Sequence, residues 1–151
     1  AASDVYKRQA QELAQEIARD GEGATKLMTV HVEQARDFVQ AKRVAKSIVN
    51  SPLVKTMIYG ADPNWGRIAM AIGKCHEQED IVPDRVQIAF GPIAVYDGRD
   101  LGEGSLDELQ RYLKGTDVVI RVALRTGKAD ATVWGCDLTE GYVDINGKYS
   151  T

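Results

Sequence analysis

Several side chains could act as nucleophiles, but none lies in an activating motif. Covalent catalysis needs a nucleophile, a base and an oxyanion hole. The residues of nucleophile type, none of them in a G-x-S-x-G turn or a comparable motif, are Thr25, Ser47, Ser51 and Cys136. His31 lies in an expected strand and His76 in a charged loop, and both are more typical of structural residues than of bases. The residues alone do not predict a self-sufficient enzyme.

The spacing of potential ligands does not predict a metal or phosphate site. Neither the two cysteines, Cys75 and Cys136, nor the two histidines match a zinc pattern. Residues 21–23 and 102–104 both read Gly-Glu-Gly, without the lysine of a phosphate-binding loop. We therefore expect no metal and no bound cofactor.

The composition is that of an ordinary globular domain. The chain has 151 residues, of which 44% are hydrophobic and 27% charged, so one domain is expected. Its net charge of −3 gives no general attraction to nucleic acid or anionic membranes. No apolar run approaches the roughly 20 residues of a membrane span, and no secretory segment is present. We expect a cytoplasmic protein with reduced thiols and with neither nucleic acid nor membrane as a partner.

Residues 51–67 (SPLVKTMIYGADPNWGR) concentrate two prolines, two glycines and a tryptophan. Glycine and proline weaken helix and strand interiors, so this block indicates a backbone held in a specific shape, for tight packing or for a ligand. Asp62 and Pro63 have the chemistry of a helix N-cap and first turn. A helix is expected to follow them, with one face made by Trp65, Ile68, Ala69 and Ile72.

The remaining elements follow from periodicity. Helical spacing predicts helices at 10–18, 38–48 and 106–113, the last with a capping box at 105–108. Alternation predicts strands at 26–32, 86–90, 93–96, 118–125 and 129–136. Residues 126–128 are expected to join the last two strands as a hairpin. The predicted fold class is α+β, with mixed, largely antiparallel sheets covered by helices, rather than a doubly wound sheet.

The first residues have an unusual sequence. Residues 3–9 (SDVYKRQ) resemble the translation of a transposon-end adapter used in sequencing libraries. Residues 1–9 are therefore expected to be such an artefact or a disordered tail. Residues 10–151 would then begin in the middle of a gene.

Five blocks, in order, resemble the ornithine acetyltransferase (glutamate N-acetyltransferase) family of arginine biosynthesis. They are residues 20–26 (DGEGATK), 51–56 (SPLVKT), 62–67 (DPNWGR), 134–138 (WGCDL) and 146–151 (NGKYST). The resemblance extends from about residue 10 to the last residue. It implies the C-terminal part of the β chain of a bifunctional acetyltransferase that cuts itself in front of a threonine. That threonine, the family's nucleophile, is missing from this chain.

The resemblance implies a ping-pong acetyl transfer from N2-acetylornithine to glutamate through an acyl-threonine, with acetyl-CoA as a further donor in some members. It implies no other cofactor. The implied partners are the α subunit and the N-terminal part of the β subunit, in a heterotetramer of two α and two β chains. The fragment alone is expected to be inactive.

Three residues match the family's substrate-binding positions. The resemblance implies that Glu22 pairs with an ammonium of ornithine, and its flanking glycines would let ligand and backbone come close. Asn146 offers an amide that both donates and accepts, and Thr151 offers a hydroxyl and a terminal carboxylate. Arg67 could bind a carboxylate or a CoA phosphate, but a structural role for its block is favoured. Trp134 is expected to be a core residue.

Other interpretations remain open at this stage. The chain could be a stand-alone, non-catalytic amino-acid-binding or subunit-interaction domain of similar fold. The tail of a related self-processing amidohydrolase is less well supported, because the ending at 146–151 points to the transferase. Absence of an Ala-Thr processing motif from the upstream gene would rule out the transferase.

Overall fold

A computed structural model describes residues 26–75, 77–78, 80–102 and 106–137, together with Val5, Arg8, Gln9 and Glu12. In this part of the chain one five-stranded sheet has the order β3-β2-β4-β1-β5. Its strands are β1 (Leu27–Ala35), β2 (Gln87–Phe90), β3 (Ile93–Asp97), β4 (Asp117–Ala123) and β5 (Ala129–Cys136). The helices are α2 (Phe38–Val49), α3 (Pro52–Tyr59), α4 (Gly66–Gly73), α5 (Leu106–Leu113) and the short 3-10 helix η1 (Pro83–Arg85).

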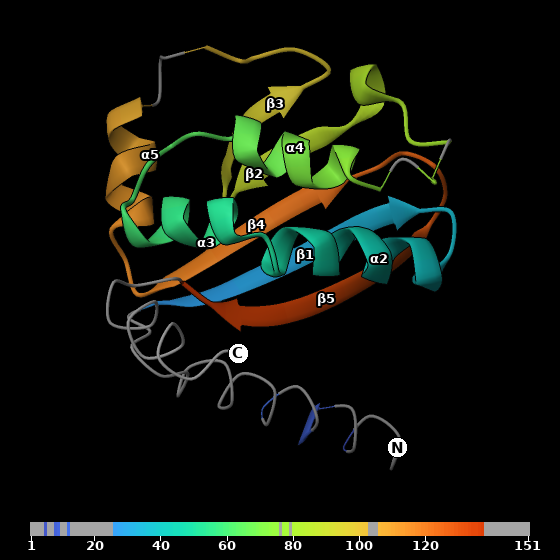
Figure 1. The fold of residues 1–151 in the computed structure, drawn as a ribbon, viewed down its shortest axis with the longest axis horizontal. Coiled ribbons are helices and arrows are strands. Elements are labelled where there is room, and N and C mark those ends of the chain that lie inside the picture. The colour runs from blue at the N-terminus through green and yellow to red at the C-terminus, as the bar shows by residue number, and fades with distance from the viewer. Residues whose placement is uncertain are drawn as a thin grey trace, which may run out of the picture.

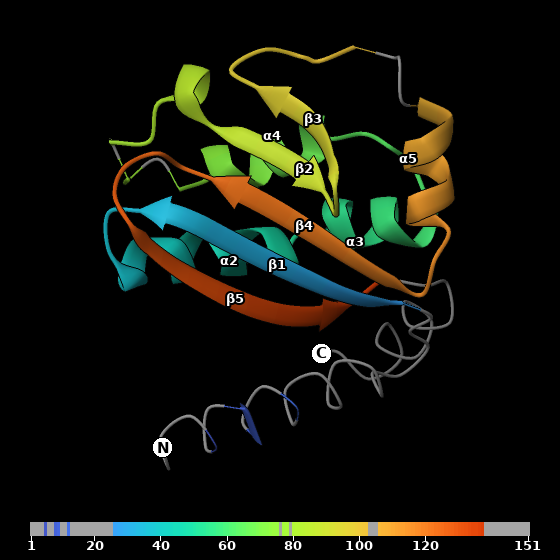
Figure 2. The ribbon, with the colours of Figure 1, turned by 180° about the vertical axis from the view of Figure 1, so that it is seen from behind.

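The helices α2, α3 and α4 lie over one face of the sheet (Figure 1). Seen from behind, the described helices leave the opposite face uncovered (Figure 2). The pairs β1–β5, β2–β3 and β2–β4 are antiparallel, and only β1–β4 is parallel. The predicted α+β class, with a mixed and largely antiparallel sheet, is confirmed.

The predicted hairpin of the last two strands is wrong. β4 and β5 form where expected, but β1 lies between them and pairs with both. The connection passes around the end of β1, where Thr126 N–H donates to Gln34 O at 2.8 Å. A Cβ on Gly127 would lie 2.5 Å from Ala35 O, so this connection can pack against β1 because it has glycine there.

The block at 51–67 contains a helix that the sequence pattern did not predict. α3 begins after Ser51, whose Oγ accepts the Val54 N–H at 3.3 Å, and Pro52 occupies its first turn. The predicted cap of the next helix is also wrong. α4 begins at Gly66 after Trp65, without a side-chain cap, so Asp62 does not cap it.

One buried core joins the helices to the sheet. Along β1 the buried side chains alternate, so Met28, Val30 and Val32 are all fully buried. They pack in the same cluster as apolar residues of α2, α3 and α4 and as Phe90 of β2. Cys75 and Cys136 are not bridged. None of the described helices is long and apolar enough to span a bilayer.

Some expectations concern residues outside the described part. The helix at 10–18 and the cap at Ser105 lie there almost entirely, as does His76. The strand at 26–32, the helix at 38–48 and the strands at 86–90 and 93–96 are confirmed as β1, α2, β2 and β3. The helix at 106–113 is α5.

The N-terminal cap of α2 yields a pH prediction. The Asp37 carboxylate accepts the Gln40 N–H at 2.8 Å and a hydrogen bond from Arg36 Nε at 3.1 Å. The hydrogen bond from the backbone N–H of Gln40 lowers the pKa of Asp37 below its ordinary value, and the side chain of Arg36 adds to this shift. The cap therefore stabilises the fold above the unfolded-state pKa of Asp37, and this contribution is lost as pH falls through the lower folded-state pKa.

Asp37→Asn keeps an acceptor oxygen at the cap, and this oxygen is not protonated in acid. When the pH is lowered from about 5 to about 2.5, we therefore expect the unfolding temperature of Asp37→Asn to fall less than that of the unmodified chain. Thermal unfolding followed by circular dichroism measures this difference. Asp37→Ala removes the acceptor and should lower the unfolding midpoint at the higher pH as well. An equal acid-induced loss in Asp37→Asn and the unmodified chain would contradict the prediction.

Candidate functional site

The three predicted substrate-contact residues, Glu22, Asn146 and Thr151, lie outside the described residues. The structure does describe where their segments join the sheet. The segment with Glu22 leads into Lys26, directly before β1, and the segment with the other two follows Asp137, directly after β5. This junction of Lys26 and Asp137 is therefore the described region nearest in sequence to the predicted site.

The two ends of the described unit are bonded to each other. Lys26 N–H donates to Asp137 Oδ1 at 3.0 Å, and Asp137 N–H donates to Lys26 O at 3.3 Å. Next to them Leu27 pairs with Cys136 in the antiparallel β1–β5 ladder. Figure 1 shows the start of β1 and the end of β5 at the same side of the sheet. The chain thus enters and leaves the sheet at one point.

Two lysines stabilise this junction. Lys26 Nζ donates to Ile58 O at 2.8 Å and to Leu113 O at 2.6 Å, while Lys55 Nζ donates to Cys136 O at 3.1 Å. Partial burial lowers the pKa of the Lys26 ammonium below its ordinary value, and the Asp137 carboxylate opposes this shift. The junction therefore combines two ammonium groups with a fully buried carboxylate.

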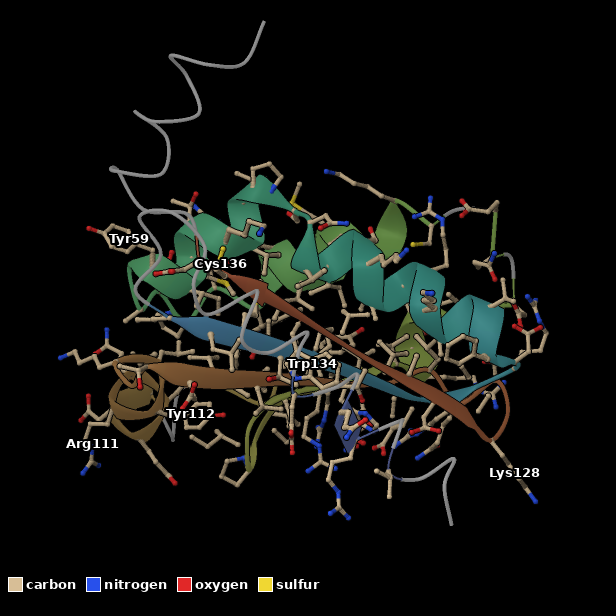
Figure 3. The ribbon with its side chains drawn as sticks, turned by 90° about the horizontal axis from the view of Figure 1, so that it is seen from below. Tyr59, Arg111, Tyr112, Lys128, Trp134 and Cys136 are labelled. Carbon is tan, nitrogen blue, oxygen red and sulfur yellow. The ribbon has the colours of Figure 1, made fainter. Side chains whose placement is uncertain are left out.

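Of the nucleophile-type side chains in the described part, the two serines have structural partners. Ser51 caps α3, and Ser47 Oγ donates to Ala71 O at 2.6 Å. Cys136, labelled in Figure 3, is a half-buried free thiol, and its carbonyl accepts a hydrogen bond from Lys55 Nζ of α3 at 3.1 Å. Arg67 Nη1 donates to Leu53 O at 2.9 Å and so links α4 to α3. This contact supports the structural role of the DPNWGR block.

A hydroxyl, an imidazole and a carboxylate come together on the uncovered face of the sheet, which the sequence did not indicate. His31 Nδ1 lies 2.8 Å from Thr132 Oγ1, and His31 Nε2 lies 3.7 Å from Glu33 Oε2. The second distance exceeds that of a hydrogen bond. Thr132 also lies within a regular strand, opposite His31, rather than at a turn that exposes a nucleophile. We interpret the group as cross-strand pairing that stabilises the sheet.

Trp134 is not a core residue. It pairs with Thr29 in the β1–β5 ladder, and it is only half-buried. Its neighbour Gly135 faces the helices, because a Cβ there would lie 2.6 Å from Val49 Cγ2 of α2. Alternation along the strand therefore places Trp134 on the uncovered face (Figure 3). The sequence could not indicate which face of β5 would be covered.

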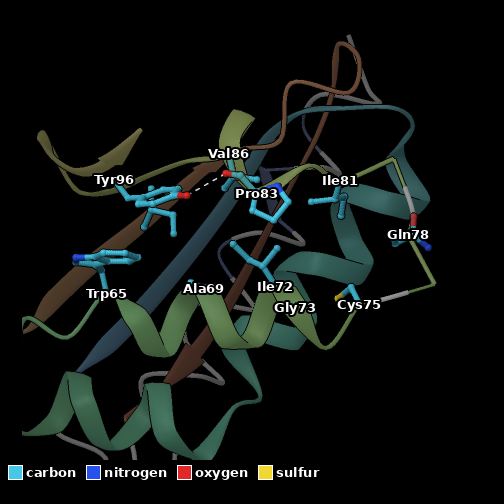
Figure 4. A pocket seen from close by; sticks show the side chains of 11 residues that line it. Trp65, Ala69, Ile72, Gly73, Cys75, Gln78, Ile81, Pro83, Val86 and Tyr96 are labelled. Carbon is cyan, nitrogen blue, oxygen red and sulfur yellow. Dashed lines mark hydrogen bonds between the residues drawn. The ribbon is translucent and has the colours of Figure 1, made fainter. Parts of the chain in front are cut away.

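An apolar pocket of about 390 Å³ lies between α4 and the β2–β3 pair (Figure 4). Trp65 and Tyr96 close one end, with ring centroids 4.8 Å apart, and Tyr96 OH donates to Pro83 O at 3.1 Å. β3 and β5 form opposite edges of the sheet, so the pocket lies toward the β3 edge and the junction toward the β5 edge. The structure therefore does not bring the DPNWGR tryptophan to the junction.

The described residues show no ready metal centre. Among them, no three His, Cys, Asp or Glu side chains gather in a way that could hold a metal ion. What the described geometry offers is a rigid attachment point for the two flanking segments, with charged groups at its centre.

Comparison with known proteins identifies relatives over almost the whole chain. Residues 2–151 match the ArgJ family. The chain is 59% identical over 142 residues to "Arginine biosynthesis bifunctional protein ArgJ 2" of a Nostoc species, covering 94% of this chain and 36% of the relative. It is 52% identical over 143 residues to "Glutamate N-acetyltransferase Oat2" of Streptomyces clavuligerus, covering 92% of this chain and 36% of that protein.

A solved structure is similar as well. The crystal structure of the arginine biosynthesis bifunctional protein argJ from Bacillus halodurans matches with a TM-score of 0.86 and 44% identity. The match covers 97% of this chain and 70% of that one. The chain spans 36% of the length of the curated relatives named above, so most of their sequence lies outside it.

Proposed function

The chain belongs to the ArgJ family, and on this basis we propose that it forms part of an acetyltransferase that moves acetyl from N2-acetylornithine to glutamate in arginine biosynthesis. The observation that carries the proposal is its 52% identity over 143 residues to a protein named glutamate N-acetyltransferase. The other portion of the enzyme, an α subunit and the N-terminal part of a β subunit, would complete a heterotetramer of two α and two β chains. Acetyl-CoA is a further candidate donor.

The proposed reaction passes through an ester on a threonine outside this chain. The threonine oxygen attacks the acetyl carbonyl of N2-acetylornithine, the C–N bond breaks, and the threonine proton leaves with the ornithine amine. The amine of glutamate then attacks the ester carbonyl, the C–O bond breaks, and a proton returns to the threonine oxygen. Two moderate barriers thereby replace one high barrier.

The role of this chain in the reaction is to bind the substrate. Glu22 is proposed to accept hydrogen bonds from the side-chain ammonium of ornithine, and an ion pair at 4 Å gains about 4 kcal/mol at an effective dielectric constant of 20, before desolvation is subtracted. Asn146 and Thr151 are proposed to contact the amino-acid end of the substrate through an amide and a hydroxyl.

The junction supports this assignment through chain connectivity. Four residues of extended chain span at most about 14 Å, which limits how far Glu22 can lie from Lys26. Asn146 is nine residues after Asp137, a stretch that spans at most about 32 Å when extended. Because Lys26 and Asp137 are hydrogen-bonded, both segments start from one point, and this is compatible with a shared substrate site.

The test replaces the region of the Streptomyces clavuligerus Oat2 protein that this chain matches with the matching part of this chain. Transfer of acetyl from N2-acetylornithine to glutamate is followed by the release of ornithine. We expect the hybrid protein to be active, and Glu22→Gln to lower its kcat/KM for N2-acetylornithine by about 10- to 100-fold, because a charge partner is lost.

Glu33→Gln, which removes a carboxylate on the uncovered sheet face, is the matched control and should leave kcat/KM unchanged. A folded hybrid without transfer activity, beside an active parent Oat2, would refute the proposed function. Equal kinetics for Glu22→Gln and the unmodified hybrid would remove Glu22 from the site.

A further inference from the structure

The Lys26 side chain, directly before β1, contacts two helices. Its ammonium donates to Ile58 O and Leu113 O, at 2.8 Å and 2.6 Å, in the last turns of α3 and α5. The carbonyl groups of a final helical turn have no partner within the helix and carry partial negative charge. Ile58 O also accepts the Ala61 N–H at 3.2 Å, so Lys26 adds a second donor there. One ammonium therefore binds the ends of two helices and ties both to the start of β1.

The backbone of the same residue holds the end of β5. Lys26 N–H binds the Asp137 carboxylate, and Lys26 O accepts the Asp137 N–H. Asp137 is completely buried, so its side chain has little freedom to follow a displaced Lys26. We call Lys26 and Asp137, with the carbonyls of Ile58 and Leu113, the clamp. It joins four segments of the chain: the start of β1, the end of β5, and the ends of α3 and α5.

The charges within the clamp depend on one another. Burial of the Lys26 ammonium is unfavourable, and its neighbour Asp137 partly offsets this cost. Removal of the ammonium would take the one side-chain donor from each of the two helix-end carbonyls and a favourable positive charge from the neighbourhood of Asp137. The expected structural result is a shift at the junction rather than the loss of the distant core.

In the sequence, Lys26 directly follows the segment with Glu22, and Asp137 directly precedes the segment with Asn146. We propose that Lys26 is a positioning residue for acetyl transfer, which fixes the placement of the Glu22 segment relative to the Asn146 segment. This inference rests on the proposed function. A displacement of about 1 Å between substrate-binding groups can change rates by up to about 100-fold, so a clamp at their common origin would act on catalysis without touching the substrate.

The kinetic test uses the hybrid protein with Lys26→Met. We expect the KM for N2-acetylornithine to rise about tenfold while kcat falls less than about threefold, because binding groups move while the nucleophile lies outside the clamp. Gln40→Met is the control, because Gln40 lies near the opposite end of β1 and its replacement destabilises the fold without touching the clamp. Its KM should stay within about twofold of the unmodified value at a temperature where both variants are folded.

A milder variant guards against misfolding. Asp137→Asn keeps an acceptor at the position of Oδ1, removes the charge and replaces the second carboxylate oxygen with an NH2 group, so it should also raise the KM, by a smaller factor. A KM that rises equally in Lys26→Met and Gln40→Met would show a general effect of stability and would overturn the proposal. Unchanged KM values in both clamp variants would overturn it as well.

A distance measurement tests the clamp independently of activity. Spin labels on Glu22→Cys and Asn146→Cys, with Cys75→Ser and Cys136→Ser, report the separation of the two segments in the hybrid protein. We expect a narrow distance distribution that broadens with Lys26→Met but not with Gln40→Met. The same width in all three proteins would refute the clamp even if transfer activity is present. Broadening in a hybrid without activity would support the clamp while the proposed function fails.

Discussion

Replacement of Gln40 with methionine is expected to lower the free energy of unfolding by about 2–4 kcal/mol, because the buried Gln40 amide is completely hydrogen-bonded. Its side chain has no exposed surface. Its Nε2 donates to Asp80 Oδ1 at 2.8 Å and to Gln78 Oε1 at 3.2 Å. Its Oε1 accepts the Arg36 N–H at 2.9 Å and the Thr126 hydroxyl at 2.6 Å. Two donors and two acceptor positions are the full capacity of an amide.

The position of Gln40 explains the size of this effect. Its partners lie on three separate stretches of the chain: the connection from β1 to α2, the segment between α4 and η1, and the connection from β4 to β5. Methionine has a similar length but no strong donor or acceptor. The Arg36 N–H and the Thr126 hydroxyl would therefore lose a partner at a site that water reaches poorly.

Urea unfolding measured by fluorescence or circular dichroism gives the free energy directly. Thr126→Val is the matched control. It removes one of the four hydrogen bonds of the Gln40 amide, together with the longer contact of the same hydroxyl with Gln34 O at 3.4 Å, and should cost about 1 kcal/mol. A Gln40→Met protein that is no less stable than Thr126→Val would show that the amide is not the centre of this network.

The sequence predicted the local structure far better than the order of the strands. Every described strand was expected from alternation, and the amphipathic spacing of α2 gave its position to within one or two residues. The hairpin of β4 and β5 failed because sequence neighbours are the default partners of a strand. Nothing local shows that β1, about a hundred residues earlier, would lie between them. Gly127, which permits close packing on Ala35, is consistent with this strand order once the structure is known.

The helix α3 was missed although its start signals are present. Ser51 followed by Pro52 is an N-cap with proline in the first turn, as the structure shows. The density of glycine and proline in the block was instead interpreted as a backbone held in a specific shape, for tight packing or for a ligand. For α4 the reverse occurred: Asp62 has the right chemistry for a cap, but Ala61 adopts a positive φ of 51° and the helix begins only at Gly66.

The clamp could not be predicted from the sequence. A lysine at the start of a strand has no local feature that indicates buried contacts. The partners of Lys26 are separated from it by 32, 87 and 111 residues. Such contacts follow from the packing of α3, α5 and β5 around β1, and periodicity carries no information about them. The family resemblance gave the contact residues in the flanking segments, whereas the structure gave the group that joins those segments.

The second large effect is expected at Gly98, where replacement with alanine should lower the free energy of unfolding by about 2–4 kcal/mol. Gly98 has a φ of +73°, in the left-handed region that costs an alanine about 1–2 kcal/mol. A Cβ at this position would also collide with the backbone oxygen of Asp84 in η1. Because that oxygen belongs to the main chain, relief requires η1 to move away from the turn after β3.

Two other glycines separate the two causes. Gly102 has a φ of +86°, but no atom lies within 4 Å of the place that a Cβ would occupy, so Gly102→Ala should show the conformational cost alone, about 1–2 kcal/mol. Gly73, in the last turn of α4, has neither problem, and Gly73→Ala should be neutral or stabilising by up to about 1 kcal/mol. Urea unfolding should therefore rank the variants Gly98→Ala, Gly102→Ala and Gly73→Ala from least to most stable. Equal stability of the first two variants would show that η1 moves away at no cost, so that the steric clash with Asp84 adds nothing to the destabilisation.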